Sequence, residues 1–162
     1  MGSGESTPFV AGSKSQTGKA AIDFFSWGHV DLGICSFLLL SLINCLPSYF
    51  EDELIYFIPY WLMLVLVFVV AIVWEIIENT LFVKLGIKFE GRRDSLKNAT
   101  WDVIFGIVGG SAAWAFKGIF INIFGVANNS IPQYVQYYYI VGIISFVLIL
   151  ICFFIGRATT KD

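Results

Sequence analysis

Carboxylate and amide side chains gather at the two ends of a polar stretch in the middle of an unusually apolar chain. They end one long apolar run and begin the next, and they are Glu75, Glu78, Asn79, Asp94, Asn98 and Asp102. Carboxylate and amide oxygens are the ligands that hard divalent cations prefer. A charged group beside a membrane-length apolar run is expensive and indicates a functional site. These residues are therefore the first candidates for chemistry.

Helical spacing predicts that these side chains share faces. Asp94, Asn98 and Asp102 recur every four residues, which places them on one stripe about 80° wide at about 100° per residue. Glu75 and Glu78 are three residues apart and also lie on one face. We expect two facing stripes of polar groups.

The only histidine of the chain, His29, lies near the start of the first apolar run. Gly33 falls on the same helical face and would let another helix approach. Asp31 lies about 200° around the helix from His29, so both cannot point straight inward. We expect His29 to face the interior and Asp31 to be secondary.

These residues divide into three predicted roles. The candidate catalytic residues are His29, Glu75, Glu78 and Asp102. The candidate ligands of a divalent cation (Mg²⁺, Mn²⁺ or Ca²⁺) are Glu75, Glu78, Asp94 and Asp102. The candidate ligand-binding residues, two amides to orient a ligand and three cations to hold an anionic headgroup, are Asn79, Asn98, Arg92, Arg93 and Lys97. No other cofactor is expected.

A structural interpretation stays open beside this one. Asp94 and Ser95 are preferred N-cap residues, and acids favour a helix N-terminus. The acids can also pair with the basic residues of the intervening loop. Asn98 and Asp102 resist the capping interpretation because they lie further into the helix. The sequence thus leaves a functional cluster and a purely structural polar network as alternatives.

The composition indicates an all-α integral membrane protein. The 162 residues are 57% hydrophobic and only 14% charged, against about 25% charged in a soluble domain. Apolar runs of roughly 20 residues are long enough to span a bilayer as helices, and they lack the alternation of a membrane β-barrel. We predict four spans, at residues 23–50, 54–84, 94–124 and 134–155. They form one domain over residues 21–157, between a flexible polar tail at 1–20 and a C-terminal tail at 158–162.

The distribution of lysine and arginine predicts the orientation. Basic residues occur in the N-terminal tail, the middle loop and the C-terminus, and the other two loops have none. The positive-inside rule then places both termini and the middle loop in the cytoplasm. Lys117 is the exception inside a span, and we expect it to reach the far interface by snorkelling. Gly106, Gly109 and Gly110 indicate close helix packing.

Cysteine content and charge add little about function. Cys35, Cys45 and Cys152 lie in apolar runs without C-x-x-C spacing and are expected to be small buried hydrophobic residues. Gly2 and Ser6 fit the short N-myristoylation pattern, which we treat as the minor alternative to an unmodified start. The net charge of −2 and the lack of a basic stripe argue against a nucleic-acid partner.

Three short motifs resemble those of a known family. They are GHVDLG, with His29 and Gly33; WEIIEN, from Trp74 to Asn79; and DSLKNATWD, from Asp94 to Asp102. The chain resembles here, over residues 26–115, the bacterial domain-of-unknown-function 2585 family of small integral membrane proteins. That family has S-H-x-x-H-G, W-E-x-x-E-N and D-S-x-x-N-S-x-x-D at these places. Leu32 stands at the second histidine, which argues against a two-histidine metal site. The resemblance implies a shared polar site and no particular activity.

Three functions fit this sequence. The first is a divalent-metal-dependent enzyme that acts on a lipid or a lipid-linked phosphate. The second is a non-catalytic protein, either a small carrier or an accessory subunit of a membrane complex. The third is a lipid-binding scaffold whose acids are structural. The expected partners are membrane lipids and either further copies of the chain or a larger membrane complex.

Overall fold

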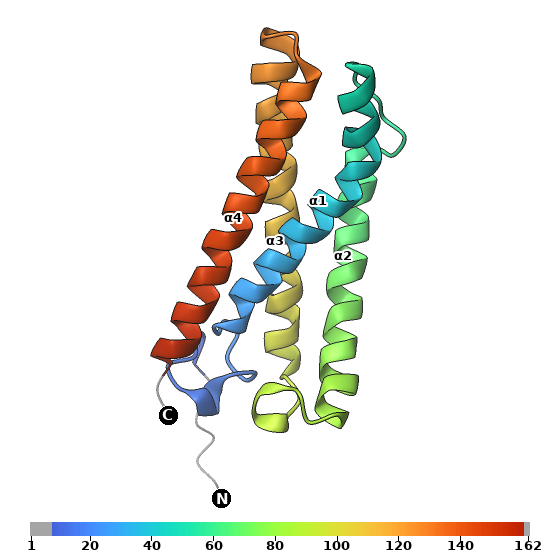
Figure 1. Cartoon of the computed structure of the whole chain (residues 1–162). Coiled ribbons are helices and arrows are strands. Elements are labelled where there is room, and N and C mark those ends of the chain that lie inside the picture. The colour runs from blue at the N-terminus through green and yellow to red at the C-terminus, as the bar shows by residue number, and fades with distance from the viewer. Residues whose placement is uncertain (1–7, 161–162) are drawn as a thin grey trace, which may run out of the picture.

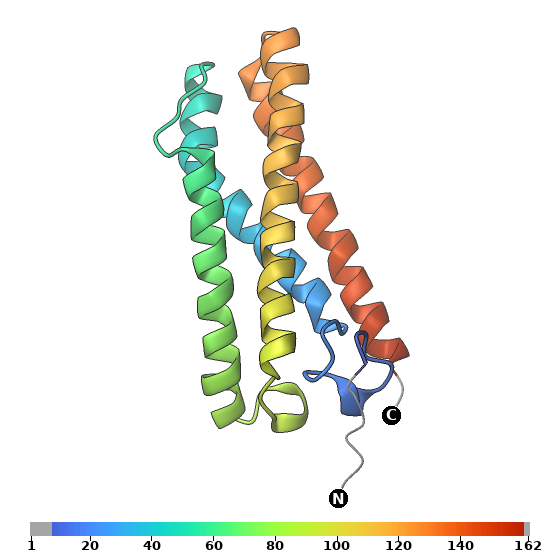
Figure 2. The same cartoon turned by 180° about the vertical axis from the view of Figure 1, so that it is seen from behind.

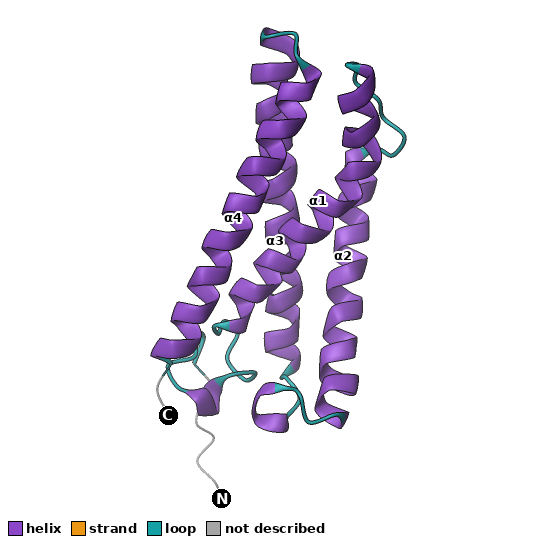
Figure 3. Cartoon of the chain, in the orientation of Figure 1, coloured by secondary structure: helices purple, strands orange, loops and turns teal. Residues whose placement is uncertain are grey.

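A computed structural model describes residues 8–160 of the chain. Four long helices make up most of it: α1 (Phe25–Glu51), α2 (Tyr60–Ile77), α3 (Leu96–Phe120) and α4 (Ile131–Thr159) (Figure 1). Coloured by secondary structure, the described part consists of helices and loops (Figure 3). Each of these four helices, together with any continuation, has the length and the apolar composition needed to cross a membrane. The predicted all-α fold with four membrane-spanning helices is confirmed, and the composition of these helices indicates an integral membrane protein.

Two of the four helices continue beyond their α-helical residues as π-helices. A π-helical segment, η2 (Glu78–Phe82), continues α2, and a second one, η4 (Ile121–Ala127), continues α3. The extended helices therefore end close to where the apolar runs end. The α4 helix continues to Thr159, so part of the predicted C-terminal tail is helical. Lys161, Gly2 and Ser6 lie outside the described residues.

The second helix begins later than predicted. The sequence favoured a start at Leu54, but α2 begins at Tyr60, directly after Pro59. The Asn44 side chain of α1 explains the difference, because its Oδ1 accepts hydrogen bonds from the amides of Phe57 and Ile58 at 2.9 and 3.1 Å. Its Nδ2 also donates to the carbonyl of Ile58 at 2.7 Å. These bonds hold the segment before Pro59 in a non-helical conformation.

The first helix crosses the bundle diagonally and contacts the other three (Figures 1 and 2). It approaches α3 closely at glycines: a Cβ built on Gly33 would lie 1.9 Å from the carbonyl oxygen of Gly106, and one on Gly109 would lie 2.1 Å from that of Val30. Only residues without a side chain permit this spacing, as in other small-residue crossings in membranes. Within the described residues α2 and α4 make no contact with each other.

Residues 8–20 differ from the flexible tail that the sequence predicted. Ala20 and Ala21 are fully buried, and a short bridge pairs Val10 with Ile22. The guanidinium of Arg92 holds this segment, because its Nη2 donates to three backbone carbonyls of residues 14–17 at 2.8–3.0 Å. Hydrogen bonds to backbone, rather than an apolar pattern, fold the segment onto the end of the bundle.

Both ends of the described chain lie at the same end of the bundle as the loop between α2 and α3 (Figure 1). This arrangement matches the predicted four-span path, while the side of the membrane stays a prediction. Lys117 Nζ lies 3.7 Å from the ring centroid of Tyr60 and 5.4 Å from that of Tyr56, so the side chain reaches toward the end of the bundle where α2 begins, but the residue is only 7% exposed. Cys45 is buried as expected, Cys35 is half-buried, and Cys152 is exposed on α4.

Candidate functional site

The His29 imidazole lies among three carboxylates from two other helices. Its Nε2 is 3.3 Å from Glu75 Oε1, 3.8 Å from Glu78 Oε2 and 3.8 Å from Asp102 Oδ2. His29, Glu75 and Asp102 are buried, and the Glu78 side chain is 14% exposed. The structure thus brings the four predicted catalytic residues together. His29 lies on α1, Glu75 and Glu78 lie on α2 and its continuation η2, and Asp102 lies on α3.

The glycine crossing between α1 and α3 makes this group possible. Asp102 lies one helical turn before Gly106, on the face of α3 that meets α1. A Cβ on Gly106 would lie 3.6 Å from the carbonyl oxygen of His29. Because the two backbones approach so closely there, short side chains from both helices reach one another.

Asn79 joins the carboxylates of α2 to the loop that follows. Its Nδ2 donates to Glu75 Oε2 at 3.0 Å, and its Oδ1 accepts from Lys88 Nζ at 3.0 Å and from the amide of Asp94 at 2.7 Å. Lys88 also pairs with Asp94 and, at 3.6 Å, with Glu78. Asn79 and Asp94 therefore belong to the cluster, where Asn79 positions charged groups.

Lys88 is a member of the cluster that sequence reasoning did not single out. Its side chain is only 6% exposed, unlike Lys84 and Arg93 in the same polar segment. The signal that could have found it is its place between two large apolar residues, Ile87 and Phe89.

Asp23 extends the cluster toward the N-terminal segment and was also missed. Its carboxylate accepts hydrogen bonds from the amides of Gly18 and Phe25, both at 2.8 Å, and from Asn98 Nδ2 at 3.4 Å. Burial raises the pKa of Asp23, and the nearby Asp94 carboxylate raises this pKa further. Asn98, predicted to contact a ligand, therefore contacts Asp23 in this structure.

The start of α3 combines both interpretations that the sequence left open. Ser95 is the N-cap, and its Oγ accepts a hydrogen bond from the amide of Asn98 at 3.1 Å. Asp102 lies deeper, where its Oδ1 accepts a hydrogen bond from Ser26 Oγ at 2.9 Å. Capping therefore explains Ser95, and Asp102 has a separate place in the buried cluster.

Two buried polar atoms of these residues have no hydrogen-bond partner among the described residues: His29 Nδ1, and Glu75 Oε1, whose neighbour is His29 Nε2 at 3.3 Å. Two sets of three residues could each hold one cation. The first set is His29, Glu75 and Glu78, and the second is Glu75, Asp94 and Asp102. Within each set, one ligand atom from every residue lies within 4.8 Å of the others. Separations of this size allow one cation to touch all members of a group, and acidic oxygens with one imidazole suit a divalent cation.

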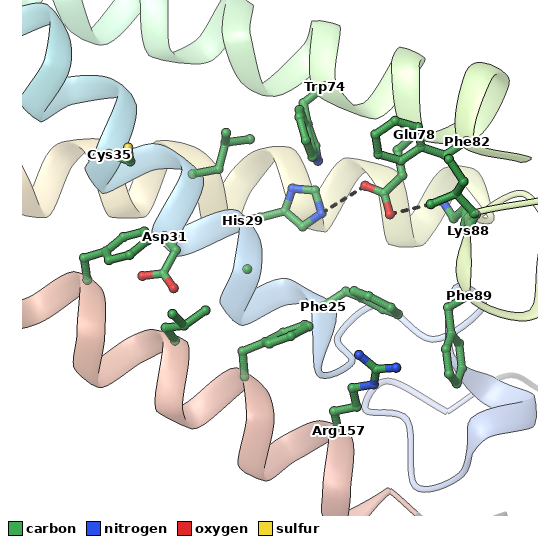
Figure 4. A pocket seen from close by; sticks show the side chains of 16 residues that line it. Phe25, His29, Asp31, Cys35, Trp74, Glu78, Phe82, Lys88, Phe89 and Arg157 are labelled. Atoms are coloured by element: carbon green, nitrogen blue, oxygen red, sulfur yellow. Dashed lines mark ion pairs between the residues drawn. The ribbon is translucent and has the colours of Figure 1, made fainter. Parts of the chain in front are cut away.

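A cavity of about 640 Å³ adjoins the cluster. It lies between α1, the end of α2 and α4, and Figure 4 shows His29 pointing toward Glu78 and Glu78 toward Lys88 along one wall. Most of the lining is apolar or aromatic, including Phe25, Trp74, Phe82, Phe89 and Phe153. Its remaining charged lining residues are Asp31 and Arg157. A charged wall facing an apolar one suits an amphiphilic ligand.

The predicted headgroup cations lie elsewhere. Arg92 binds backbone carbonyls, Arg93 is exposed, and Lys97 Nζ lies 5.5 Å from the ring centroid of Phe9. None of the three lines the cavity, whereas Lys88 and Arg157 do. His29 is buried as expected, and Asp31 is buried as well.

Searches with this chain against models of known protein families, against curated proteins and against solved structures found no match. The resemblance to the domain-of-unknown-function 2585 family stays a prediction based on the three motifs. The functional argument therefore proceeds from the geometry of the site.

Proposed function

We propose that this protein is a divalent-metal-dependent enzyme that acts on a lipid phosphate at the membrane surface. The observation that carries the proposal is the position of His29 Nε2 within 3.8 Å of three carboxylates, beside a largely apolar cavity. Each part of the proposal follows from one property of this site: its charge, its cavity and its histidine.

The charge of the cluster calls for a further cation. Its acids are Asp23, Glu75, Glu78, Asp94 and Asp102, and the basic side chains beside them in the described structure include Lys88 and His29, fewer than the five acids. Buried carboxylates in excess over cations are strongly unfavourable unless a metal or a proton neutralises them. Glu75 Oε1, which accepts no hydrogen bond, would be a ligand for Mg²⁺ or Mn²⁺, with Glu78, Asp94 and Asp102 around it.

The cavity supports a lipid as the substrate. It lies where α2 and α4 make no contact, so its apolar side is bordered by helices that face the bilayer. Lys88 and Arg157 supply positive charge at the polar end, as a phosphate group requires. A lipid phosphate would thus place its chain along the apolar wall and its headgroup beside His29.

Hydrolysis of a phosphate ester is the reaction that these groups fit. In this proposal His29 Nε2 takes a proton from a water molecule as the water oxygen attacks phosphorus. The bond from phosphorus to the lipid oxygen breaks, and that oxygen takes up the proton that His29 received, so the products are a lipid alcohol and inorganic phosphate. Lys88, Arg157 and a divalent cation would offset the negative charge on the phosphoryl oxygens.

A non-catalytic role is the second candidate, and the hydrogen bonds of Asn79 favour it. This one side chain links α2 to the loop residue Lys88 and to the backbone of Asp94. Such a network can simply fasten α2 to α3 in a scaffold, a small carrier or an accessory subunit. The two candidates differ in what removal of a carboxylate does to turnover.

The test is phosphate release from a defined lipid phosphate, with and without Mg²⁺, by the purified full chain in detergent. We expect Mg²⁺-dependent turnover that falls at least about 100-fold in Glu75→Gln and Asp102→Asn. Glu53→Gln and Asp52→Asn make the same chemical changes at the opposite end of the bundle and should keep full activity. Absence of turnover in the wild type, or unchanged turnover in both cluster variants, would refute the enzyme proposal.

A further inference from the structure

Asp31 is a buried acid that the cluster around His29 does not use. The residue is 5% exposed, and neither carboxylate oxygen has a hydrogen-bond partner among the described residues. It lines the cavity, and Figure 4 shows its carboxylate between α1 and α4 while His29 points toward α2. A buried carboxylate without a partner is costly, so a ligand that donates a hydrogen bond to it would bind favourably.

The position of Asp31 along α1 indicates which part of a ligand it would meet. It follows His29 by two residues, which places it about 3 Å further along the helix axis and away from the end where α1 begins. Lys88 and Arg157 line the same cavity, and Arg157 lies near the end of α4, where that helix meets the start of α1 (Figure 4). Because Asp31 also lies about 200° around α1 from His29, a lipid whose phosphate lies beside His29 reaches Asp31 with a group several bonds away from the phosphate.

We propose that Asp31 accepts a hydrogen bond from an ammonium or hydroxyl group on the lipid backbone, several bonds away from the phosphate. This inference rests on the proposed function and specifies its substrate class. A cavity of about 640 Å³ lies within the usual range of about 300–1,000 Å³ for sites that enclose one small ligand, which favours a lipid with a single chain.

Three probes that differ in one group test this inference. They are hexadecyl phosphate, which has no donor, 4-hydroxyhexadecyl phosphate and 4-aminohexadecyl phosphate. Binding to the full chain in detergent with Mg²⁺ is measured by competition against labelled hexadecyl phosphate. We expect at least one donor-bearing probe to bind about 10-fold more tightly than hexadecyl phosphate, as one charge-assisted hydrogen bond would give. Which probe gains identifies the donor as ammonium or hydroxyl.

Substitutions then connect the preference to Asp31. Asp31→Leu should bind hexadecyl phosphate like the wild type and lose the preference, because only the acceptor is removed. Cys35→Ala, one turn further along α1 and in the same cavity, should keep the preference. Asp31→Asn keeps one acceptor oxygen and should lose most of the advantage of the ammonium probe. Equal binding of all three probes to the wild type, or an unchanged preference in Asp31→Leu, would overturn the inference.

The same measurements separate this inference from the proposed function. Binding of hexadecyl phosphate that requires Mg²⁺ but shows no donor preference would overturn the role of Asp31 alone. A donor preference that needs Asp31 but neither Mg²⁺ nor Glu75 would support the role of Asp31 and contradict the metal-dependent enzyme. Failure of all three probes to bind would overturn both.

Discussion

At the scale of single residues, the main feature is a buried cluster of carboxylates that has few basic side chains beside it. Glu78 and Asp94 both pair with Lys88, which Asn79 also contacts. Glu75 Oε1 accepts no hydrogen bond in the described structure, and its neighbour is His29 Nε2 at 3.3 Å. The lysine neutralises only part of the cluster, and a divalent cation would neutralise the rest.

Replacing Lys88 by methionine tests this balance. Removal of one partner from a buried ion pair typically lowers the free energy of unfolding by about 3–5 kcal/mol. We expect Lys88→Met to be destabilised by about this amount without metal and to regain much of the loss with Mn²⁺, because the cation binds the freed carboxylates. Thermal unfolding in detergent with and without Mn²⁺ measures both effects.

The exposed Lys84 provides the matched control for this change. Lys84→Met should alter the free energy of unfolding by no more than about 0.5 kcal/mol, as surface substitutions usually do. A Lys88→Met protein as stable as the wild type without metal would show that the lysine carries no neutralising role.

At the scale of elements, the crossing of α1 and α3 determines whether the cluster can form. At this crossing the backbones of the two helices are in direct contact, because Gly33 packs against Gly106 and Gly109 packs against Val30. The crossing lies one turn from both His29 and Asp102, so any separation of the two helices would also separate those side chains.

A methyl group at Gly33 should therefore disturb both stability and the site. We expect Gly33→Ala to lower the free energy of unfolding by about 3 kcal/mol or more, because the Cβ would meet backbone atoms that cannot rotate away. Metal affinity should fall with it. Gly118→Ala on α3 is the control, since a Cβ there has no neighbour within 4 Å and the change should stay within about 1 kcal/mol. Denaturant unfolding in detergent compares the two, and equal stability would contradict the account of the crossing.

The same elements show what the sequence could and could not predict. Apolar runs were enough to predict the four helices, and the spacing of Glu75, Glu78 and Asp102 was enough to predict that they meet. Lys88 and Asp23 were missed because their burial depends on how two loops fold, which no periodic pattern records. Asp31 was considered secondary because a single inward face was assumed for α1, whereas α1 has neighbours on several sides.

The predicted flexible tail shows the same limit. Its composition, rich in glycine, serine and lysine, carries no apolar period. Its fold depends instead on hydrogen bonds from Arg92 to backbone carbonyls, a contact between residues more than 70 positions apart. Long-range hydrogen bonds of this kind leave no local signal.

At the scale of the whole molecule, the cluster and the polar end of the cavity lie at the end of the bundle where both ends of the described chain and the basic loop between α2 and α3 lie (Figure 1). The positive-inside rule predicts that this end faces the cytoplasm. The opposite loops, at residues 52–59 and 128–130, contain no lysine or arginine.

Cysteine labelling tests this orientation. In a chain without its three native cysteines, we expect a membrane-impermeant maleimide to label Glu53→Cys but not Lys84→Cys in intact cells, because the two positions lie at opposite ends of the bundle. Detergent permeabilisation should expose both. Labelling of Lys84→Cys alone before permeabilisation would reverse the orientation and place the site on the outer face.

The most direct test of the central claim is the metal content of the purified full chain after equilibration with Mn²⁺ and removal of unbound ions, measured by elemental mass spectrometry. The account predicts close to one Mn²⁺ per chain, lost in Glu75→Gln and Asp102→Asn and retained in the matched controls Glu53→Gln and Asp52→Asn. No bound metal in the wild type, or equal metal in all five proteins, would contradict a divalent-cation site at the carboxylates around His29.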